Sequence, residues 1–250
     1  MPALGLRIDA ARLKFRGQWL FHDLGCELPA ASWTCLLGRS GCGKSSLLRL
    51  IAGLPLPESS HISIATDDER PLAGRIAWMA QQDLLLPWRR VIDNVLLGPA
   101  LRGKPQRDDR ARAEALLEAV GLADKRDHWP ASLSGGQRQR VALARTLFES
   151  APVVLMDEPF SALDAITRLE LHELSARLLQ GRTVLLVTHD PLEALRLADQ
   201  MLIFQGQPAR LERLGPPPGA RPRDPVDPRL SEWQARLLAR LRNVSGDASQ

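Results

Sequence analysis

One stretch of the chain has the residue types and spacing that bind polyphosphate, G-x-x-x-x-G-K-S/T, with Gly38, Gly43, Lys44 and Ser45 at the defining positions. Glycines let a loop fold back so that several backbone N–H groups point at one anion. The lysine adds a mobile positive charge for the phosphates, and the serine offers a hydroxyl to Mg²⁺. The predicted nucleotide contacts in this loop are Gly38, Arg39, Ser40, Gly41, Cys42, Gly43, Lys44, Ser45 and Ser46.

Two adjacent acids, Asp157 and Glu158, follow a continuous apolar run over residues 153–156. Such a run is typical of a parallel strand buried on both faces. At the end of that strand, Asp157 would reach Mg²⁺ through water, and Glu158 would polarise an attacking water as a general base. Two acids at this place are also compatible with a strand that simply meets solvent.

A histidine, His189, ends a second apolar run one strand later. Asp190, Pro191 and Glu193 after it have the pattern of a helix start: an N-cap, a first helical residue and the acid of a capping box. His189 is therefore expected between a strand tip and a helix start, where α/β sheets bind ligands.

A second glycine-rich string, LSGGQ at 133–137, is followed by RQRVALAR. Ser134, Gly135 and Gly136 are predicted at the start of a helix, where a hydroxyl and free backbone N–H groups make an anion site. The buried stripe of this helix is predicted to be Val141, Ala144, Leu147 and Phe148.

The elements that must position these residues alternate between strand and helix. Residues 32–37 predict a buried strand that enters the phosphate loop, and residues 75–80 predict a further strand. Apolar residues at helical spacing follow the loop, and Gly53 would end that helix. Residues 108–122 predict an amphipathic helix that stops at Gly121. The apolar positions of the two helices are Leu47, Leu50, Ile51 and Leu54, and Leu116, Leu117 and Val120.

Taken in order, these strings and Gln81 resemble the ATP-binding subunit of an ABC transporter, over about Leu6 to Phe204. The resemblance implies an ATP site that is split between two copies of the protein. The start of the LSGGQ helix would cap the γ-phosphate held by the phosphate loop of the partner copy. The signature contacts to ATP would come from Ser134, Gly135, Gly136 and Gln137.

The same resemblance assigns further roles around the phosphates. Asp164, in the string SALD, would cross the dimer interface and orient the facing site. His189 would contact the γ-phosphate and link it to Glu158. Gln81 would contact Mg²⁺ and the attacking water, although Gln82 is adjacent and remains an alternative. The implied catalytic residues are Glu158, His189 and Gln81; the implied metal contacts are Ser45, Gln81 and Asp157; and the implied cofactors are ATP and Mg²⁺.

Adenine is usually stacked on an aromatic residue in this family, often Tyr, and the chain has no Tyr. Phe15 stands at the matching position, and Trp19 is the alternative. Stacking needs only a π face, so Phe can serve.

The pattern and the resemblance predict an α/β fold: a P-loop NTPase core with a mainly parallel sheet, an N-terminal antiparallel β subdomain and an inserted helical subdomain. The ATP-binding domain is predicted over residues 1–205. Short antiparallel strands are expected over 1–35, parallel strands with their helices over 36–82 and 150–205, and the helical subdomain over about 83–149.

Residues 206–250 are predicted to form a Pro/Arg-rich tail with a C-terminal amphipathic helix over 230–241. Two interpretations of this basic helix stay open: contact with anionic lipid, or packing back on the core with its arginines in solvent. Its apolar face is predicted to be Trp233, Leu237, Leu238 and Leu241.

No apolar run approaches the roughly 18 residues that cross a bilayer. The resemblance therefore implies separate membrane permease subunits as partners, a second copy of the chain, and indirectly a solute-binding protein, with no nucleic acid. It places the protein peripherally at the cytoplasmic face of the inner (plasma) membrane. The segment 83–95 would line a groove for a permease helix, or its apolar residues would be internal core. Those residues are Leu84, Leu85, Leu86 and Trp88.

The strings AWMAQQDLLLPW and RPRDP resemble the nitrate, sulfonate and taurine importers, and within them the importers of thiamine's pyrimidine precursor. Two alternatives remain: a soluble ABC ATPase that is not tied to a transporter, and an adaptor that binds ATP without hydrolysing it. The presence of Glu158 and His189 argues against the adaptor.

Overall fold

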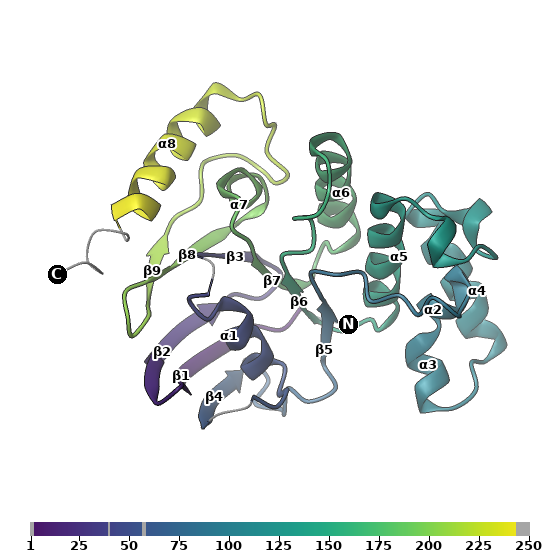
Figure 1. The fold of residues 1–250 in the computed structure, drawn as a ribbon, viewed down its shortest axis with the longest axis horizontal. Coiled ribbons are helices and arrows are strands. Elements are labelled where there is room, and N and C mark those ends of the chain that lie inside the picture. The colour runs from purple at the N-terminus through teal and green to yellow at the C-terminus, as the bar shows by residue number, and fades with distance from the viewer. Residues whose placement is uncertain (1–2, 40, 57–58, 244–250) are drawn as a thin grey trace.

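Continuous apolar runs form the buried strands of a six-stranded sheet in the order β5-β6-β7-β3-β8-β9. The computed structural model describes residues 3–39, 41–56 and 59–243 (Figure 1). The first five strands in this order, β5, β6, β7, β3 and β8, are parallel to one another, and the edge strand β9 runs antiparallel to β8. The strands are β3 (Trp33–Leu37), β5 (Ile76–Met79), β6 (Val153–Asp157), β7 (Thr183–Val187), β8 (Gln200–Gln205) and β9 (Arg210–Leu214). The mainly parallel sheet predicted from the sequence is confirmed.

Three further strands form a separate antiparallel sheet in the order β2-β1-β4. They are β1 (Leu6–Phe15), β2 (Gln18–Leu28) and β4 (Ser60–Thr66). The antiparallel N-terminal sheet is confirmed, but β4 corrects the expectation that residues 36–82 supply only parallel strands. Its Ile62 and Ile64 pack inward while His61 and Ser63 are exposed, an alternation that suits a sheet with one face in solvent.

Side chains of the parallel strands alternate between two cores. On one face, Cys35, Val154 and Leu186 pack with the helices that follow the strands. On the other face, Leu36 and Leu155 pack with α1 and the antiparallel sheet. The helices are α1 (Lys44–Ile51), α2 (Val91–Val95), α3 (Leu97–Arg102), α4 (Arg107–Ala119), α5 (Gly135–Phe148), α6 (Ala165–Leu178), α7 (Pro191–Leu197) and α8 (Pro228–Asn243), with 3₁₀ turns at Ala123–Lys125 and Pro130–Ser132.

Helix α1 ends earlier than its apolar spacing predicts. Gly53 has φ +68°, so the chain turns away after Ala52, and Leu54 is 45% exposed. Leu54 is therefore not part of the helix face. In α4 and α5 the predicted stripes are buried, with Leu116 partly covered.

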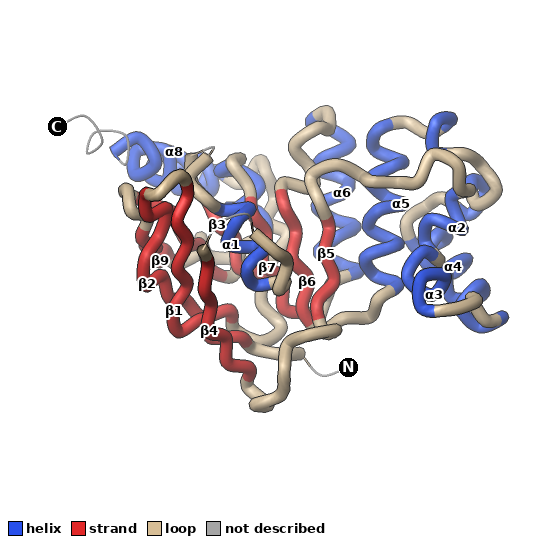
Figure 2. Tube along the Cα trace, turned by 60° about the horizontal axis from the view of Figure 1, so that its bottom comes forward, coloured by secondary structure: helices blue, strands red, loops and turns tan. Residues whose placement is uncertain are grey.

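Helices α2 to α5 gather at one end of the molecule, and the antiparallel sheet lies at the other (Figures 1 and 2). In the loop before α2, Leu84 and Trp88 are exposed, whereas Leu85 is buried. The core interpretation thus holds for Leu85, and the groove for a permease helix stays a prediction. Among the described residues, no helix is both long and apolar enough to cross a membrane.

Two parts of the chain after β8 contact the core: the strand β9 and the segment around Arg223. Arg210–Leu214, which the sequence places in the Pro/Arg-rich tail, forms the antiparallel edge strand β9. Arg223 is buried, and its guanidinium donates to the carbonyls of Leu195 (3.0 Å) and Ala198 (2.9 Å) at the end of α7. Helix α8 then packs near α7.

The apolar face of α8 is turned toward the core. Leu230 and Leu237 are buried, and Trp233 and Leu241 pack beside them, while Leu238 is 37% exposed. This arrangement supports the interpretation in which the helix packs back on the protein.

We expect Leu237→Ala to lower the free energy of unfolding by about 2–5 kcal/mol, because it opens a cavity under α8. Leu238→Ala, one residue on but largely outside the contact, should cost less than about 1 kcal/mol. Chemical denaturation of both variants measures the difference. Equal losses of unfolding free energy in the two variants would contradict the described packing of α8 on the core.

Candidate functional site

The predicted phosphate and acid residues come together at the carboxyl edge of the parallel sheet. The phosphate loop follows β3, Asp157 ends β6, and Thr188 and His189 follow β7. In the sheet, Asp157 lies opposite Val187, and Val187 lies opposite Leu36. Since these three strands are neighbours and parallel, the residues after them share one edge.

The phosphate loop is shaped by glycine. Gly43 has φ +106°, and a Cβ there would lie 2.7 Å from Cδ2 of Leu20. Helix α1 begins directly after it, so the first backbone N–H groups of the helix face the loop. Ser40, one of the predicted contacts, lies outside the described residues.

Lys44 is buried within this loop, and its Nζ donates to the carbonyls of Gly38 and Arg39, each at 2.8 Å. Ser45 is exposed and Ser46 is half-buried at the start of α1. Cys42 is a free, half-buried thiol with its Sγ 4.0 Å from Lys44 Nζ. The Lys44 ammonium group is thus held inside the loop, beside the backbone atoms that would surround a phosphate.

A hydroxyl and a carboxylate meet beside the loop. Ser45 Oγ donates to Asp157 Oδ1 at 2.9 Å. Burial and the charge of Glu158 raise the pKa of Asp157, and the hydrogen bond from Ser45 opposes that rise. A cation held at these two oxygens would favour the ionised carboxylate.

Glu158 is the centre of a second group of contacts. Its Oε2 lies 2.9 Å from His189 Nδ1 and 3.4 Å from Gln81 Nε2. Its backbone has φ +47° and donates from N to the carbonyl of Val187 at 2.9 Å. A non-glycine residue in this left-handed region is held there by its surroundings, which fixes where the carboxylate points.

Gln81 itself is fixed from the helical end of the molecule. Gln139 in α5 donates from Nε2 to the carbonyl of Gln81 at 3.0 Å. The Gln81 amide also reaches Ser161 Oγ at 3.4 Å, and Ser161 donates to the carbonyl of Glu158 at 2.9 Å. These contacts favour Gln81 over the adjacent Gln82 as the residue that faces Glu158.

The helix start after His189 differs from the sequence pattern. Asp190 is the N-cap of α7 and accepts from the N–H of Leu192 at 2.9 Å, as expected. Glu193 does not complete a capping box, because the N–H of Asp190 donates to Thr188 Oγ1 at 2.9 Å instead. Glu193 is buried and accepts from the Thr188 hydroxyl at 3.2 Å.

A cavity of about 270 Å³ opens beside Glu158 and His189. Sequence reasoning missed three of its lining residues: Thr188, Glu193 and Arg168, which donates to Asp190 Oδ2 at 3.0 Å. The sequence places a glutamate at the third position of the helix, where it fits a capping box as well as it fits a buried role. Only the tertiary contacts separate the two.

Ser134 and Gln137 form a reciprocal capping box at the start of α5. Ser134 Oγ accepts from the N–H of Gln137 at 3.2 Å, and Gln137 Oε1 accepts from the N–H of Ser134 at 3.0 Å. A Cβ on Gly136 would lie 2.4 Å from Cγ2 of Thr167, whereas Gly135 has open space on that side. Asp164 caps α6 by accepting from the N–H of Thr167 at 3.0 Å, which lowers its pKa.

The start of α5 is not next to the phosphate loop of its own chain. Figures 1 and 2 both show α1 and α5 on opposite sides of β5 and β6. In one copy of the protein, the phosphate loop and the LSGGQ helix therefore lie on two separate parts of the surface.

Phe15 and Trp19 lie at the hairpin between β1 and β2. Phe15 is 51% exposed, with the Arg16 guanidinium 5.4 Å from its ring centre. Trp19 is 36% exposed, with Lys14 Nζ over its face at 4.6 Å and His22 at its edge. The greater exposure favours Phe15 as the ring available for stacking.

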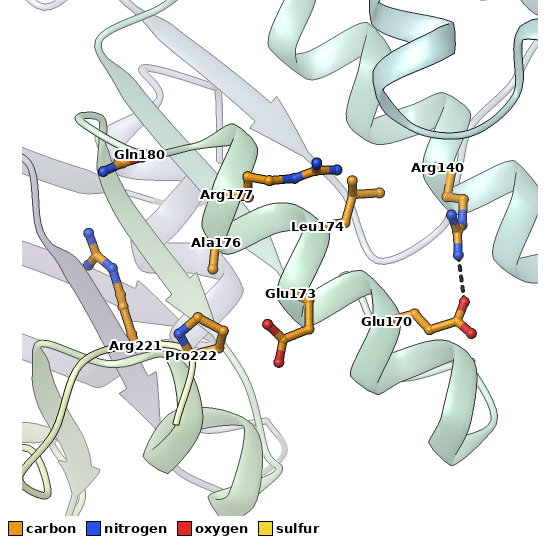
Figure 3. A pocket seen from close by; sticks show the side chains of 9 residues that line it. All are labelled: Arg140, Glu170, Glu173, Leu174, Ala176, Arg177, Gln180, Arg221 and Pro222. Atoms are coloured by element: carbon orange, nitrogen blue, oxygen red, sulfur yellow. Dashed lines mark hydrogen bonds and ion pairs between the residues drawn. The ribbon is translucent and has the colours of Figure 1, made fainter. Parts of the chain in front are cut away.

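A larger cavity of about 780 Å³ lies beside α6, away from the predicted site residues (Figure 3). Two of its three arginines already face carboxylates: Arg140 pairs with Glu170 at 2.6 Å, and Arg221 pairs with Asp199. Because no predicted site residue lines it, we do not assign the phosphate chemistry to this cavity.

A family profile described as "ABC transporter" matches residues 21–161. The "Aliphatic sulfonates import ATP-binding protein SsuB" of Rhodopseudomonas palustris (strain BisA53) is 43% identical, over 100% of this chain and 88% of that protein. The protein named SsuB 1 with the same description in Rhodococcus jostii (strain RHA1) is 44% identical, over 95% of each chain. A solved structure of a metal-chelate type ABC transporter in an inward-facing conformation is similar with a TM-score of 0.71 and 26% identity, over 84% of this chain and 83% of that one.

The burial of Glu193 predicts a pH-dependent stability. Burial, with Asp190 nearby, raises the pKa of Glu193 from 4.5 to about 8. The folded protein therefore binds this proton more tightly than the unfolded chain, and the resulting stabilisation is lost as pH rises from about 4.5 through about 8. Glu193→Gln cannot titrate, so its melting temperature relative to the parent should rise between pH 5 and pH 8.

The measurement compares thermal melts of parent and variant at several pH values, with Glu118→Gln on the exposed face of α4 as the control. Burial and Arg196 also lower the pKa of His172 to about 3, which affects stability below about pH 6.5, so the rise above pH 6.5 is the part of the comparison that reports on Glu193. A difference in melting temperature that does not change with pH would show that Glu193 is not buried with its proton.

Proposed function

Since the chain belongs to the family of ABC transporter ATP-binding proteins, we propose that it hydrolyses ATP to power solute import through separate membrane subunits. The observation that carries the proposal is the contact between Glu158 Oε2 and His189 Nδ1, at 2.9 Å, at the same sheet edge as the phosphate loop. A carboxylate beside polyphosphate, oriented by an imidazole, is the arrangement of a general base for water.

In the proposed reaction, Glu158 takes the proton of a water that attacks the γ-phosphate in line. His189 holds the Glu158 carboxylate on one side, and Gln81 approaches the same oxygen from the other. Lys44 and the N–H groups at the start of α1 stabilise the negative charge of the phosphates. Phe15 offers its exposed ring to adenine.

The residues present fit a magnesium ion. Mg²⁺ prefers oxygen ligands, and Ser45 and Asp157 bring a hydroxyl and a carboxylate within 2.9 Å of each other. We propose that Ser45, Asp157 and Gln81 hold the ion. The described residues include no cluster of three or more His, Cys, Asp or Glu suited to a metal, so the phosphates and water would complete its shell. When bound, the ion would neutralise charge on the phosphates.

We propose that two copies complete each site. The start of α5 offers a helix N-terminus and the Ser134 hydroxyl, but it lies across β5 and β6 from its own phosphate loop. A second copy, turned to face the first, would bring its Ser134 and Gly136 onto the bound γ-phosphate, with Asp164 near the contact. Helix dipoles and amides at that point stabilise negative charge.

We propose that the membrane partner binds near the exposed Leu84 and Trp88, and that the protein works at the cytoplasmic face of the membrane. The two relatives are named as ATP-binding proteins for the import of aliphatic sulfonates, which supports small organic sulfonates as the solute class delivered by a solute-binding protein. Sulfonate-stimulated phosphate release from the reconstituted transporter tests this. Stimulation by nitrate and not by sulfonates would contradict the solute class.

Glu158→Gln should retain ATP binding and lower turnover by about 10²–10⁴-fold, because the amide cannot take a proton from water. Phosphate release and the binding of a fluorescent ATP analogue measure the two effects. Glu118→Gln serves as the control. Parent-like hydrolysis in Glu158→Gln would remove Glu158 as the base, and failure of the parent to hydrolyse ATP would favour the adaptor alternative.

Substitutions at Ser134 separate its two roles. Asp and Asn both cap helices as well as Ser, but only Asp adds a negative charge where the partner's γ-phosphate is proposed to lie. In a Glu158→Gln background, Ser134→Asp should keep the parent melting temperature and weaken the ATP-dependent dimer by about ten-fold or more. Ser134→Asn should dimerise like the parent.

Light scattering with and without ATP measures this dimer. Equal dimerisation of the Asp and Asn variants would contradict a phosphate contact at Ser134.

A further inference from the structure

The imidazole of His189 has little around it to hold it in place. Its side chain is 54% exposed, yet Nδ1 lies 2.9 Å from Glu158 Oε2. An exposed ring with this degree of freedom keeps such a contact only if its backbone is fixed. The turn made by Thr188, His189 and Asp190 must therefore set the direction of the ring.

Thr188 is the fixed point of that turn. It is 2% exposed, and its N–H donates to the carbonyl of Leu36 at 3.1 Å. Its hydroxyl accepts from the N–H of Asp190 at 2.9 Å, so it closes the turn around His189. A hydroxyl has one proton to donate, and here it goes to Glu193 Oε2 at 3.2 Å.

A buried histidine lies on the opposite side of Glu193, too far away to hydrogen-bond to it. Arg196 donates from Nη1 to His172 Nδ1 at 3.2 Å, so the neutral ring carries its proton on Nε2. That Nε2 faces Glu193 Oε2 at 3.9 Å. Arg196 is itself fixed, because its Nε donates to the carbonyl of Arg223 at 2.9 Å.

The charges around Glu193 come from three elements. Asp190 on α7 and Glu158 after β6 are acidic, Arg168 on α6 is basic, and His172 and Arg196 lie beyond them. Glu193 lines the same cavity as Glu158 and His189, and its buried Oε1 has no hydrogen-bond partner among the described residues.

We propose that Glu193 is a positioning residue for ATP hydrolysis: by accepting the Thr188 hydroxyl it fixes the Thr188–Asp190 turn and so aims His189 at Glu158. Glu193 touches neither nucleotide nor water in this role. The proposal rests on the proposed function, since it concerns the geometry of the same general base.

The test compares Glu193→Gln with Glu193→Leu in the full chain with MgATP. Gln keeps an oxygen that can accept from Thr188, whereas Leu has a similar size and no acceptor. Glu193→Leu should lower kcat about ten-fold or more with KM for ATP within about two-fold, because the phosphate loop is untouched. Glu193→Gln should stay within about two-fold of the parent.

Thr188 provides the second arm and guards against a variant that does not fold. Thr188→Val should lower kcat like Glu193→Leu, and Thr188→Ser should retain it. If the two residues act through each other, the double variant Thr188→Val, Glu193→Leu should lose no more activity than either single variant. Thermal melts identify the variants that fold.

Three results would overturn the proposal: parent-like kcat in folded Glu193→Leu, parent-like kcat in Thr188→Val, or fully additive losses in the double variant. These are distinct from failure of the proposed function. In that case the parent would release no phosphate from ATP, and the role of Glu193 would fall with it.

Discussion

The parallel register of β5, β6, β7 and β3 is the constraint on which the site depends. Backbone hydrogen bonds place Met79 opposite Met156, Asp157 opposite Val187, and Val187 opposite Leu36. The chain leaves each strand at nearly the same level, so Gln81, the adjacent acids Asp157 and Glu158, His189 and the phosphate loop meet although they come from four separate parts of the sequence. A slip of one residue would turn Asp157 to the opposite face of the sheet.

Beneath that edge, the core contains charged and polar groups that an apolar core would not tolerate alone. Glu193, His172 and Arg196 are each at most 3% exposed. Arg196 reaches the exposed carboxylate of Glu173 at 2.7 Å, which connects the cluster to solvent. Buried groups of this kind are costly unless they are paired, and a paired network fixes one arrangement of its members. Here the members join the helix after His189 to α6 and to the C-terminal segment.

Much of this fold could be predicted from the sequence, because the signals were local. The continuous apolar runs before Asp157 and His189 are strands, and the phosphate loop lies between a strand and a helix. One failure depended on partners distant in the chain, because Ser60–Thr66 pairs with β1. The other two involve near neighbours: β9 forms a hairpin with β8, and Glu193 accepts from Thr188 five residues earlier. The residue types in those two segments fit a tail and a capping box equally well, so the sequence pattern did not reveal the contacts.

Helix α7 is only seven residues long, and a helix of that length is not stable in isolation. Two carbonyls at its end accept hydrogen bonds from the guanidinium of Arg223, which follows the last sheet strand in sequence. During synthesis on a ribosome, the chain would thus expose His189 long before the guanidinium that secures its helix has left the exit tunnel. The turn that carries His189 would then be among the last parts of the protein to become fixed.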